Sequence, residues 1–163
     1  MTSLDLQLRA PAHRVSSRAK RYWAVRALAG WLVVVAGADA IAFAFSTRAA
    51  VITACVAVGL AALHVTVMPR WRFRVHRWET TDTAVYTQSG WFNQERRIAP
   101  VGRIQTVDTQ RGPFEQLFGL ANVTVTTASA AGPLKIPGLD RDVADRIVED
   151  LTVRTQRTPG DGT

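Results

Sequence analysis

The chain has 163 residues, enough for one ordinary domain, and carries 20 Lys and Arg against 13 Asp and Glu, a net charge of +7. Residues 1–77 hold eleven basic against two acidic residues (+9), whereas residues 78–163 hold nine against eleven (−2). A nucleic-acid-binding domain is expected to carry its own basic patch, so this distribution argues against nucleic-acid binding. Cys55 is the only cysteine and the three histidines are scattered, which excludes an intrachain disulfide and any recognisable metal-binding motif.

Two long apolar stretches follow a basic N-terminal segment. Residues 1–21 are predicted to form a basic, flexible cytoplasmic N-terminus, and residues 22–69 a transmembrane helical hairpin. Its two spans cover residues 27–45 and 49–68, and each can cross a hydrocarbon core of about 30 Å at about 1.5 Å per residue. Three residues separate the spans, so the hairpin has no room for a domain on its far side.

The distribution of basic residues around the two spans predicts their orientation. Six Lys or Arg lie between residues 9 and 26 and four between residues 70 and 77, whereas the connection holds Arg48 alone. Because cytoplasmic flanks are enriched in Lys and Arg, both termini are expected in the cytoplasm and the protein in the cell membrane, with two spans. A cleaved signal peptide fits less well, since its apolar region is typically about 7–15 residues long.

Asp39 is the unusual residue of the hairpin, because an acid at the centre of a span costs roughly 2.5–3.5 kcal/mol. His64 is about 13 Å away along the helix axis, too far to pair with it directly. Three alternatives remain open: a local bond or a reach towards the interface, an intramembrane contact with another subunit or membrane protein, and ion or proton transport.

Residues 70–154 are predicted to form a small β-rich cytoplasmic domain that lies against the inner leaflet of the membrane. Pro69 is expected to end the second helix, and Trp71, Phe73 and Val75 alternate with basic residues as in a strand. A very short helix is predicted near Phe114 and ends at Gly119. The further predicted strands lie at residues 83–89, 91–98, 104–110, 123–126 and 134–136.

The last predicted element is an amphipathic helix from about Asp140, a plausible N-cap, to Arg154. Val143, Ile147 and Leu151 fall four apart and form the apolar stripe that packs on a sheet. Residues 155–163 are expected to be a disordered tail. The fold class is therefore α+β: an N-terminal two-helix transmembrane hairpin, then a small antiparallel β-sheet domain capped by a C-terminal helix.

The stretch from Ala99 to Leu139 resembles the second type of bacterial pleckstrin-homology-like (PH-like) domain, long called a domain of unknown function. The features that carry the resemblance are Pro100, Arg103-Ile104-Gln105, Val107, Gly112-Pro113, Leu117-Phe118-Gly119-Leu120 and Val123-Thr124-Val125. The arrangement of hairpin and domain over residues 22–152 resembles the short YdbS-type membrane proteins. The resemblance implies a strongly bent antiparallel sheet closed by the C-terminal helix and a role at the cell envelope, and it brings no catalytic residues.

The function predicted first is a membrane-anchored, non-enzymatic interaction module that binds a membrane or cytoplasmic protein or a second copy of itself. The alternative is a sensor of anionic lipid headgroups. The chain shows no nucleophile–base pair and no glycine-rich phosphate cradle, so no enzymatic activity, cofactor or metal is expected. Candidate lipid or partner contacts are Arg70, Arg72, Arg74, Arg96, Arg97, Arg103 and Gln105, and the candidate intramembrane contact is Asp39.

Overall fold

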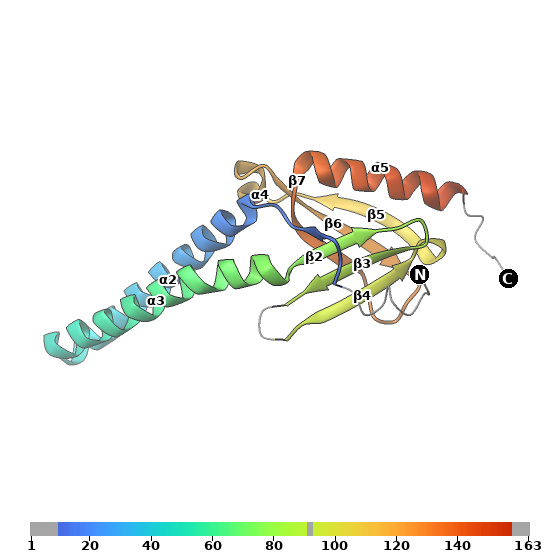
Figure 1. Ribbon diagram of the computed structural model, residues 1–163. Helices are drawn as coiled ribbons and strands as arrows, with labels where there is room; N and C mark the ends of the chain where they lie inside the picture. The colour runs from blue at the N-terminus through green and yellow to red at the C-terminus, as the bar shows by residue number, and fades with distance from the viewer. Residues whose placement is uncertain (1–9, 91–92, 158–163) are drawn as a thin grey trace.

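The computed structural model describes residues 10–90 and 93–157, in which a helical hairpin projects from a β domain (Figure 1). The hairpin consists of α2 (Arg18–Phe45) and α3 (Thr47–Val75), both long and apolar enough to cross a membrane. Their apolar windows are not buried against the rest of the chain. Ser46 alone connects them in extended conformation, and its side chain accepts a hydrogen bond from the Ala49 N–H, which caps the start of α3.

The predicted end of the second helix at Pro69 was wrong, because α3 continues through Pro69 to Val75. Proline removes the hydrogen bond to the carbonyl four residues earlier, here that of Val65, and its ring crowds that carbonyl. On the next residue, the Arg70 side chain donates to the carbonyl of Thr66. The predicted strand at Trp71, Phe73 and Val75 is therefore the last part of α3, and the first strand of the domain proper begins at Arg77.

The β domain consists of two antiparallel sheets. One has four strands in the order β1-β2-β3-β4, and the other has three in the order β5-β6-β7. A single 3₁₀ turn, η1 (Val101–Arg103), connects the sheets. The strands are β1 (His13–Arg14), β2 (Arg77–Thr80), β3 (Ala84–Ser89), β4 (Glu95–Pro100), β5 (Ile104–Gln110), β6 (Leu120–Thr127) and β7 (Leu134–Asp140).

Several predicted boundaries need correction, and one of them is β6, which begins at Leu120, three residues before the predicted start of that strand. The N-terminal segment is not a free arm from its start to residue 21, since β1 pairs with β2 and α2 begins at Arg18. The strand predicted at 134–136 continues as β7 to Asp140, because Asn122 Oδ1 accepts the Gly138 N–H at 2.9 Å where the register shifts. β4 starts at Glu95, later than predicted, and residues 91–92, 1–9 and 158–163 lie outside the described residues.

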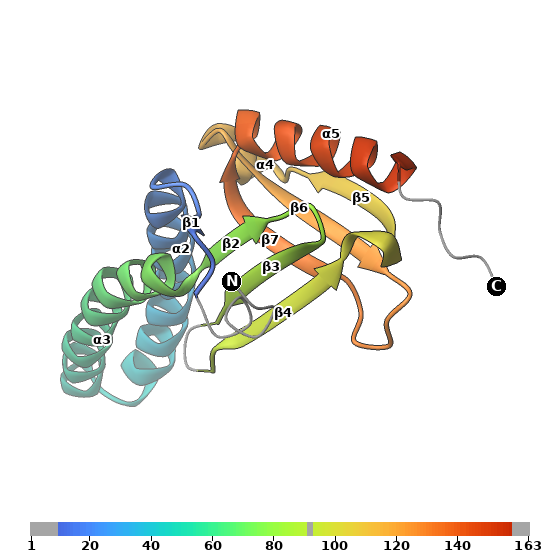
Figure 2. The same cartoon turned by 45° about the vertical axis from the view of Figure 1, so that its right-hand side comes forward.

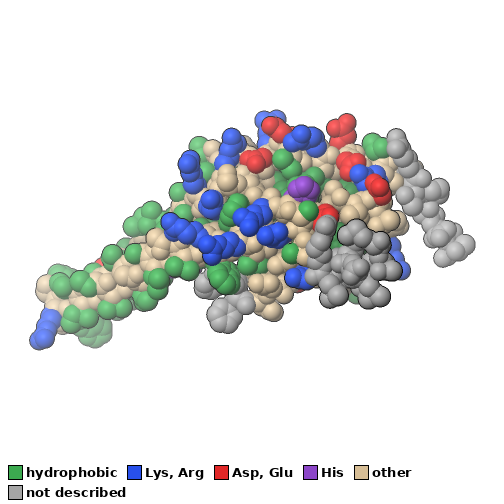
Figure 3. Space-filling view, in the orientation of Figure 1, with side chains coloured by type: hydrophobic (Ala, Val, Ile, Leu, Met, Phe, Trp, Pro, Cys, Tyr) green, Lys and Arg blue, Asp and Glu red, His purple; other side chains and the backbone are tan. Residues whose placement is uncertain are grey.

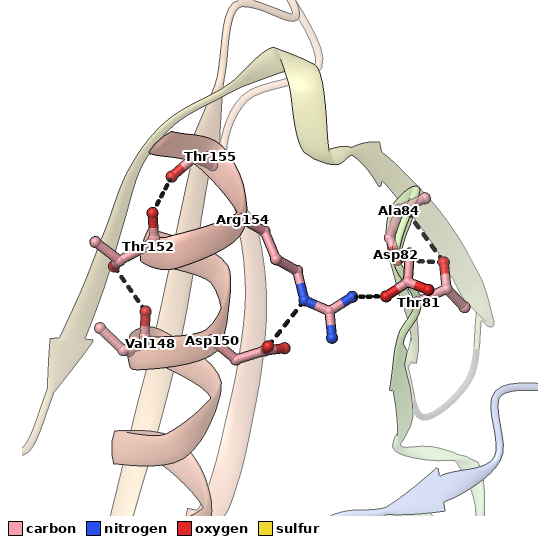
Figure 4. Close-up of polar contacts among 8 residues, drawn as sticks. All are labelled: Thr81, Asp82, Ala84, Val148, Asp150, Thr152, Arg154 and Thr155. Carbon is pink, nitrogen blue, oxygen red and sulfur yellow. Dashed lines mark hydrogen bonds and ion pairs between the residues drawn. The ribbon is translucent and has the colours of Figure 1, made fainter. Parts of the chain in front are cut away.

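The C-terminal helix α5 (Arg141–Arg157) covers the three-stranded sheet and extends three residues beyond its predicted end (Figure 2). Arg154 connects α5 to the other sheet: its Nε donates to Asp150 Oδ1 at 2.8 Å, and a guanidinium NH2 group donates to Asp82 in the β2–β3 turn (Figure 4). The domain core comprises Val85, Ala99, Ala121, Val123, Val125, Leu134, Ile136, Leu139, Ala144, Ile147 and Leu151.

A second apolar cluster joins the hairpin to the domain. This junction cluster consists of Val15, Ala19, Tyr22, Trp23 and Leu120, with Phe73, Trp78 and Phe118 packed around it. The Ser16 hydroxyl donates to Asp140 Oδ1 at 2.7 Å and the Ser16 N–H donates to the Gly138 carbonyl at 2.9 Å, both just outside the cluster. The domain is therefore docked on the base of the hairpin and is not merely tethered to it.

Candidate functional site

A polar groove opens where the hairpin meets the three-stranded sheet. Its larger part is a cavity of about 530 Å³ between α2, α3 and the sheet. A neighbouring cavity of about 460 Å³ extends it towards the end of β3 and shares Met68, Arg72, Lys135 and Pro137 with it. We call the two cavities together the junction groove.

The junction groove lies at the level where the two apolar stretches end. Ala27, the first residue of the first stretch, and Met68, the last of the second, both line it. Figure 3 shows Lys and Arg side chains gathered where the hairpin meets the domain, while the projecting part of the hairpin is mostly apolar. A ligand in this groove would therefore contact both the hairpin base and the sheet.

Three cations and one acid line the larger cavity: Arg26, Arg72 and Lys135, with Glu115 the sole acidic side chain among its described lining residues. The Arg72 guanidinium carbon lies 4.5 Å from the ring centroid of Trp23, so stacking holds this cation in place. Arg26 donates to the Tyr22 hydroxyl at 3.1 Å. The groove thus has a net positive charge carried by two oriented guanidinium groups and one exposed lysine.

Glu115 connects the short helix α4 (Pro113–Leu117) to α2. Its Oε1 accepts a hydrogen bond from the Tyr22 hydroxyl at 2.8 Å. Burial alone would raise the pKa of Glu115, but the hydrogen bond from Tyr22, with further donors and the charge of Arg26, holds that pKa below its ordinary value. The carboxylate therefore stays ionised and fixes Tyr22 and Arg26 at one wall of the groove.

His76 lines the neighbouring cavity but adds no charge to it at neutral pH. Its side chain is 3% exposed, and burial together with the nearby Arg72 cation lowers its pKa to about 4. Nδ1 lies 2.9 Å from the Arg72 carbonyl, which can only accept, so Nδ1 carries the proton. Nε2 then accepts from Arg72 Nε at 3.4 Å, and neutral His76 orients the cation that faces the groove.

The hairpin holds a polar pair that sequence reasoning did not find. Trp31 Nε1 donates to His64 Nδ1 at 2.9 Å, with ring centroids 6.2 Å apart. His64 thus has Trp31 as a hydrogen-bond partner, whereas Asp39 lies too far along the helix axis to pair with it. Asp39 Oδ1 is buried and has no hydrogen-bond partner within the described part of the chain, so its intramembrane contact remains a prediction.

The predicted basic contacts do not form one surface. Arg70, Arg72 and Arg74 all lie on the last turns of α3, but only Arg72 lines the junction groove. Arg70 bonds the Thr66 carbonyl, and Arg74 is exposed.

The remaining predicted contacts lie elsewhere on the domain. Arg97 donates to the carbonyls of Ala131, Gly132 and Pro133, which fixes the β6–β7 loop against β4. Its neighbour Arg96 is exposed on β4. Arg103 and Gln105 lie near the start of β5, whereas the groove-lining Gln110 is at its end, roughly 17 Å from Gln105 at about 3.3 Å per residue.

Sequence reasoning missed Arg26, Lys135, Glu115 and Tyr22 as site residues. Arg26 was interpreted only as a topological flank, and Lys135 only as part of the short strand predicted at residues 134–136. The contact between α2 and the β5–β7 sheet that gathers them could not be deduced from local pattern. Among residues 10–90 and 93–157, no three His, Cys, Asp or Glu side chains are grouped so as to hold a metal ion.

Comparisons with known proteins agree with this architecture. The chain is 34% identical over 97 residues to the UPF0699 transmembrane protein YdbS of Bacillus subtilis (strain 168), an alignment covering 60% of each protein. No solved structure matches. Residues 24–154 match the family described as the bacterial PH domain, a range that includes most of the hairpin, strands β2 to β7 and most of α5. This confirms the resemblance found in the sequence: the chain belongs to the bacterial PH domain family and is a membrane protein with two spans.

Proposed function

We propose that this protein is a membrane-anchored, non-enzymatic module whose junction groove binds the phosphate of anionic lipid headgroups at the cytoplasmic face of the membrane. The observation that carries the proposal is the groove itself: three cations and one acid, located where the apolar stretches end. Each basic group near an anionic surface contributes about 1 kcal/mol of attraction.

The groove chemistry favours phosphate over a neutral ligand. Stacking and a hydrogen bond hold Arg72 and Arg26 before any ligand arrives, so less side-chain entropy is lost on binding. Guanidinium groups bind phosphate oxygens through paired hydrogen bonds. Lys135 lines the same cavity from β7 and provides an exposed third cation.

A cytoplasmic location of the groove, which we infer from the basic flanks of the spans, would suit the same ligand. The basic residues that flank both spans favour cytoplasmic termini by the positive-inside rule. The cytoplasmic leaflet carries the anionic lipids that would satisfy such a groove. Cysteine variants at Arg21 and Arg48, in a chain lacking Cys55, test the orientation: an impermeant thiol reagent added outside cells should label only the position-48 variant.

The binding proposal is tested by titrating the full-length protein in neutral detergent with short-chain phosphatidylglycerol or phosphatidylcholine. A ligand that binds only the folded state raises the unfolding temperature, and at a given concentration the rise is larger for a tighter ligand. We expect a clear rise with the anionic lipid, a small one with the zwitterionic lipid, and a loss of the difference at high salt. Lys135→Gln should weaken anionic binding about fivefold, and Arg72→Gln at least as much.

Arg103→Gln is the matched control, because it removes the same kind of charge far from the groove and should leave the titration unchanged. Inorganic phosphate, titrated in parallel, distinguishes a free anion from a lipid, and equal affinity for phosphate and lipid would argue against a lipid ligand. Equal shifts with both lipids, or a Lys135→Gln protein that binds like the wild type, would refute the proposal.

A second candidate function, self-association through the hairpin, is favoured by Asp39. Its buried Oδ1 lacks a partner among the described residues, and a polar group in hydrocarbon gains by finding one in another chain. Crosslinking in native membranes should give a dimer or a larger complex that Asp39→Leu abolishes. A monomeric wild-type protein would exclude this candidate.

A further inference from the structure

The short helix α4 exposes two large apolar side chains beside the hairpin. Phe114 is 64% exposed and Leu117 is 78% exposed, and their spacing puts them on the same side of the helix. Gly112-Pro113 starts the helix and Gly119, with φ +65°, ends it. Scattered exposed apolar residues are ordinary, so the surroundings of this pair decide its meaning.

The pair continues the apolar surface of the first span. A cavity of about 300 Å³ between α2 and α4 is lined mostly by apolar atoms, from Val25 and Ala29 on one side and Phe114 and Phe118 on the other. Ala29 belongs to the apolar stretch that begins at Ala27. Exposed Val25 and Leu28 extend the same surface along α2, at 45% and 48% exposure. In Figure 1, α4 lies beside the domain end of α2.

Several contacts fix α4 in this position. The Tyr22 ring packs edge-on against Phe118 with centroids 6.0 Å apart, and the Tyr22 hydroxyl donates to Glu115. A Cβ at Gly112 would lie 2.5 Å from Glu115 Oε2, so a larger residue there would displace the carboxylate that folds back over the helix start. The helix cannot turn its apolar side inward without breaking the bond to α2.

Arginine side chains lie beside α4. A cavity of about 430 Å³ next to the helix is lined by Arg111 and Arg141, and Arg18 lies against Gly119. Arg18 pairs with Asp140, and Arg111 and Arg141 pair with Asp145, at 3.0–3.8 Å, while Glu115 lies on α4 itself. An apolar face bordered by charged side chains, arginines among them, suits a segment that lies in the membrane interface.

We propose that α4 inserts Phe114 and Leu117 into the boundary between lipid headgroups and acyl chains. The protein would then contact the bilayer through its β domain as well as through the two spans of the hairpin. The occupant of this surface is lipid hydrocarbon, because the surface is continuous with the lipid-facing side of α2. Segments of this kind penetrate about 5–10 Å. The insertion does not depend on phosphate binding in the junction groove.

The test uses the full-length protein in phospholipid vesicles, in a Cys55→Ala background that leaves no other cysteine. A polarity-sensitive fluorophore is attached to Leu117→Cys and, as controls, to Gln116→Cys on the same helix and Val153→Cys on α5. We expect the label at position 117 to emit at shorter wavelength, to be quenched by lipid-borne nitroxide, and to be protected severalfold from aqueous iodide relative to position 153. Position 116 should be intermediate.

Equal iodide quenching at positions 117 and 153 would overturn the proposal. A photoreactive amino acid at position 117 gives a label-free check: crosslinks to lipid acyl chains support insertion, whereas crosslinks to a second protein chain contradict it. Adding Lys135→Gln should leave the protection of position 117 unchanged even though it weakens anionic-lipid binding, so failure of either proposal can be recognised separately.

Discussion

The domain core and the junction cluster stabilise the protein in different ways. The domain core is aliphatic and lies between the sheets and α5, where Leu151, Val123 and Val125 are completely buried. The junction cluster is aromatic and bordered by cations: Lys20 lies 4.6 Å from the Phe73 ring centroid, and Arg72 lies over Trp23. The core therefore determines whether the domain folds, whereas the junction cluster determines where the folded domain sits on the hairpin and whether the groove is assembled.

The largest expected effect comes from the domain core. Leu151→Ala should destabilise the full-length protein by about 2–5 kcal/mol, because it removes a fully buried side chain of α5 and leaves a cavity. Denaturant unfolding in mild detergent measures the change. Val153→Ala, on the same helix but 40% exposed, should cost less than about 0.5 kcal/mol. Equal effects of the two substitutions would mean that α5 does not pack through the Leu151 face.

His76 should make the junction sensitive to acid. Its folded-state pKa of about 4 lies below the ordinary 6.5, so the unfolded chain binds more protons between these values. Its contribution to stability is thus intact above about pH 6.5 and is lost as the pH falls towards 4, by up to about 3 kcal/mol over that window.

Thermal unfolding midpoints between pH 7.5 and 5 measure this dependence. His76→Gln should flatten the profile, whereas His13→Gln, an exposed residue on β1, should retain the wild-type slope. If His76→Gln keeps the full slope, burial of this imidazole is not its cause.

Gly138 tests the close approach of β7 to α2 with a smaller effect. At φ +73° any side chain is strained by about 1–2 kcal/mol, and a Cβ would also lie 3.1 Å from Ala19 Cβ and 3.5 Å from Trp23 Cζ2. Gly132→Ala is the matched control, since Gly132 has φ +75° but open space around it. Gly138→Ala should lower the unfolding temperature more than Gly132→Ala, and equal losses would argue against tight docking.

The elements that the sequence predicted well are those with a long apolar run or a regular pattern of apolar residues. The two apolar stretches, β3 and the apolar stripe of α5 were recognisable from their local pattern, and β5 from its β-branched residues. The end of α3 was not, because a seven-residue alternation also satisfies a helix: Arg72 and His76, four apart, share a helix face. Phe73 on the junction cluster and the packing of α3 against α2 outweighed the signal of Pro69.

The candidate site was predicted only in part, and for a physical reason. Arg72 was recognised because it belongs to a local run of arginines, but that run was interpreted as one basic surface. Arg26, Lys135 and Glu115 come from three distant segments that only the docking of α2 against β7 and α4 brings together. Arg97 was also among the predicted contacts, yet its guanidinium group donates to backbone carbonyls of the β6–β7 loop.

The central claim is that a groove formed by docking of the domain on the hairpin selects anionic lipid. The most direct measurement is the composition of the lipids retained by the full-length protein after extraction from bilayers of known composition, determined by mass spectrometry. We expect anionic phospholipid to be enriched several-fold over the bilayer average, with the enrichment lost in Lys135→Gln and retained in Arg103→Gln. Retained lipid that matches the bilayer composition in all three proteins would contradict the account.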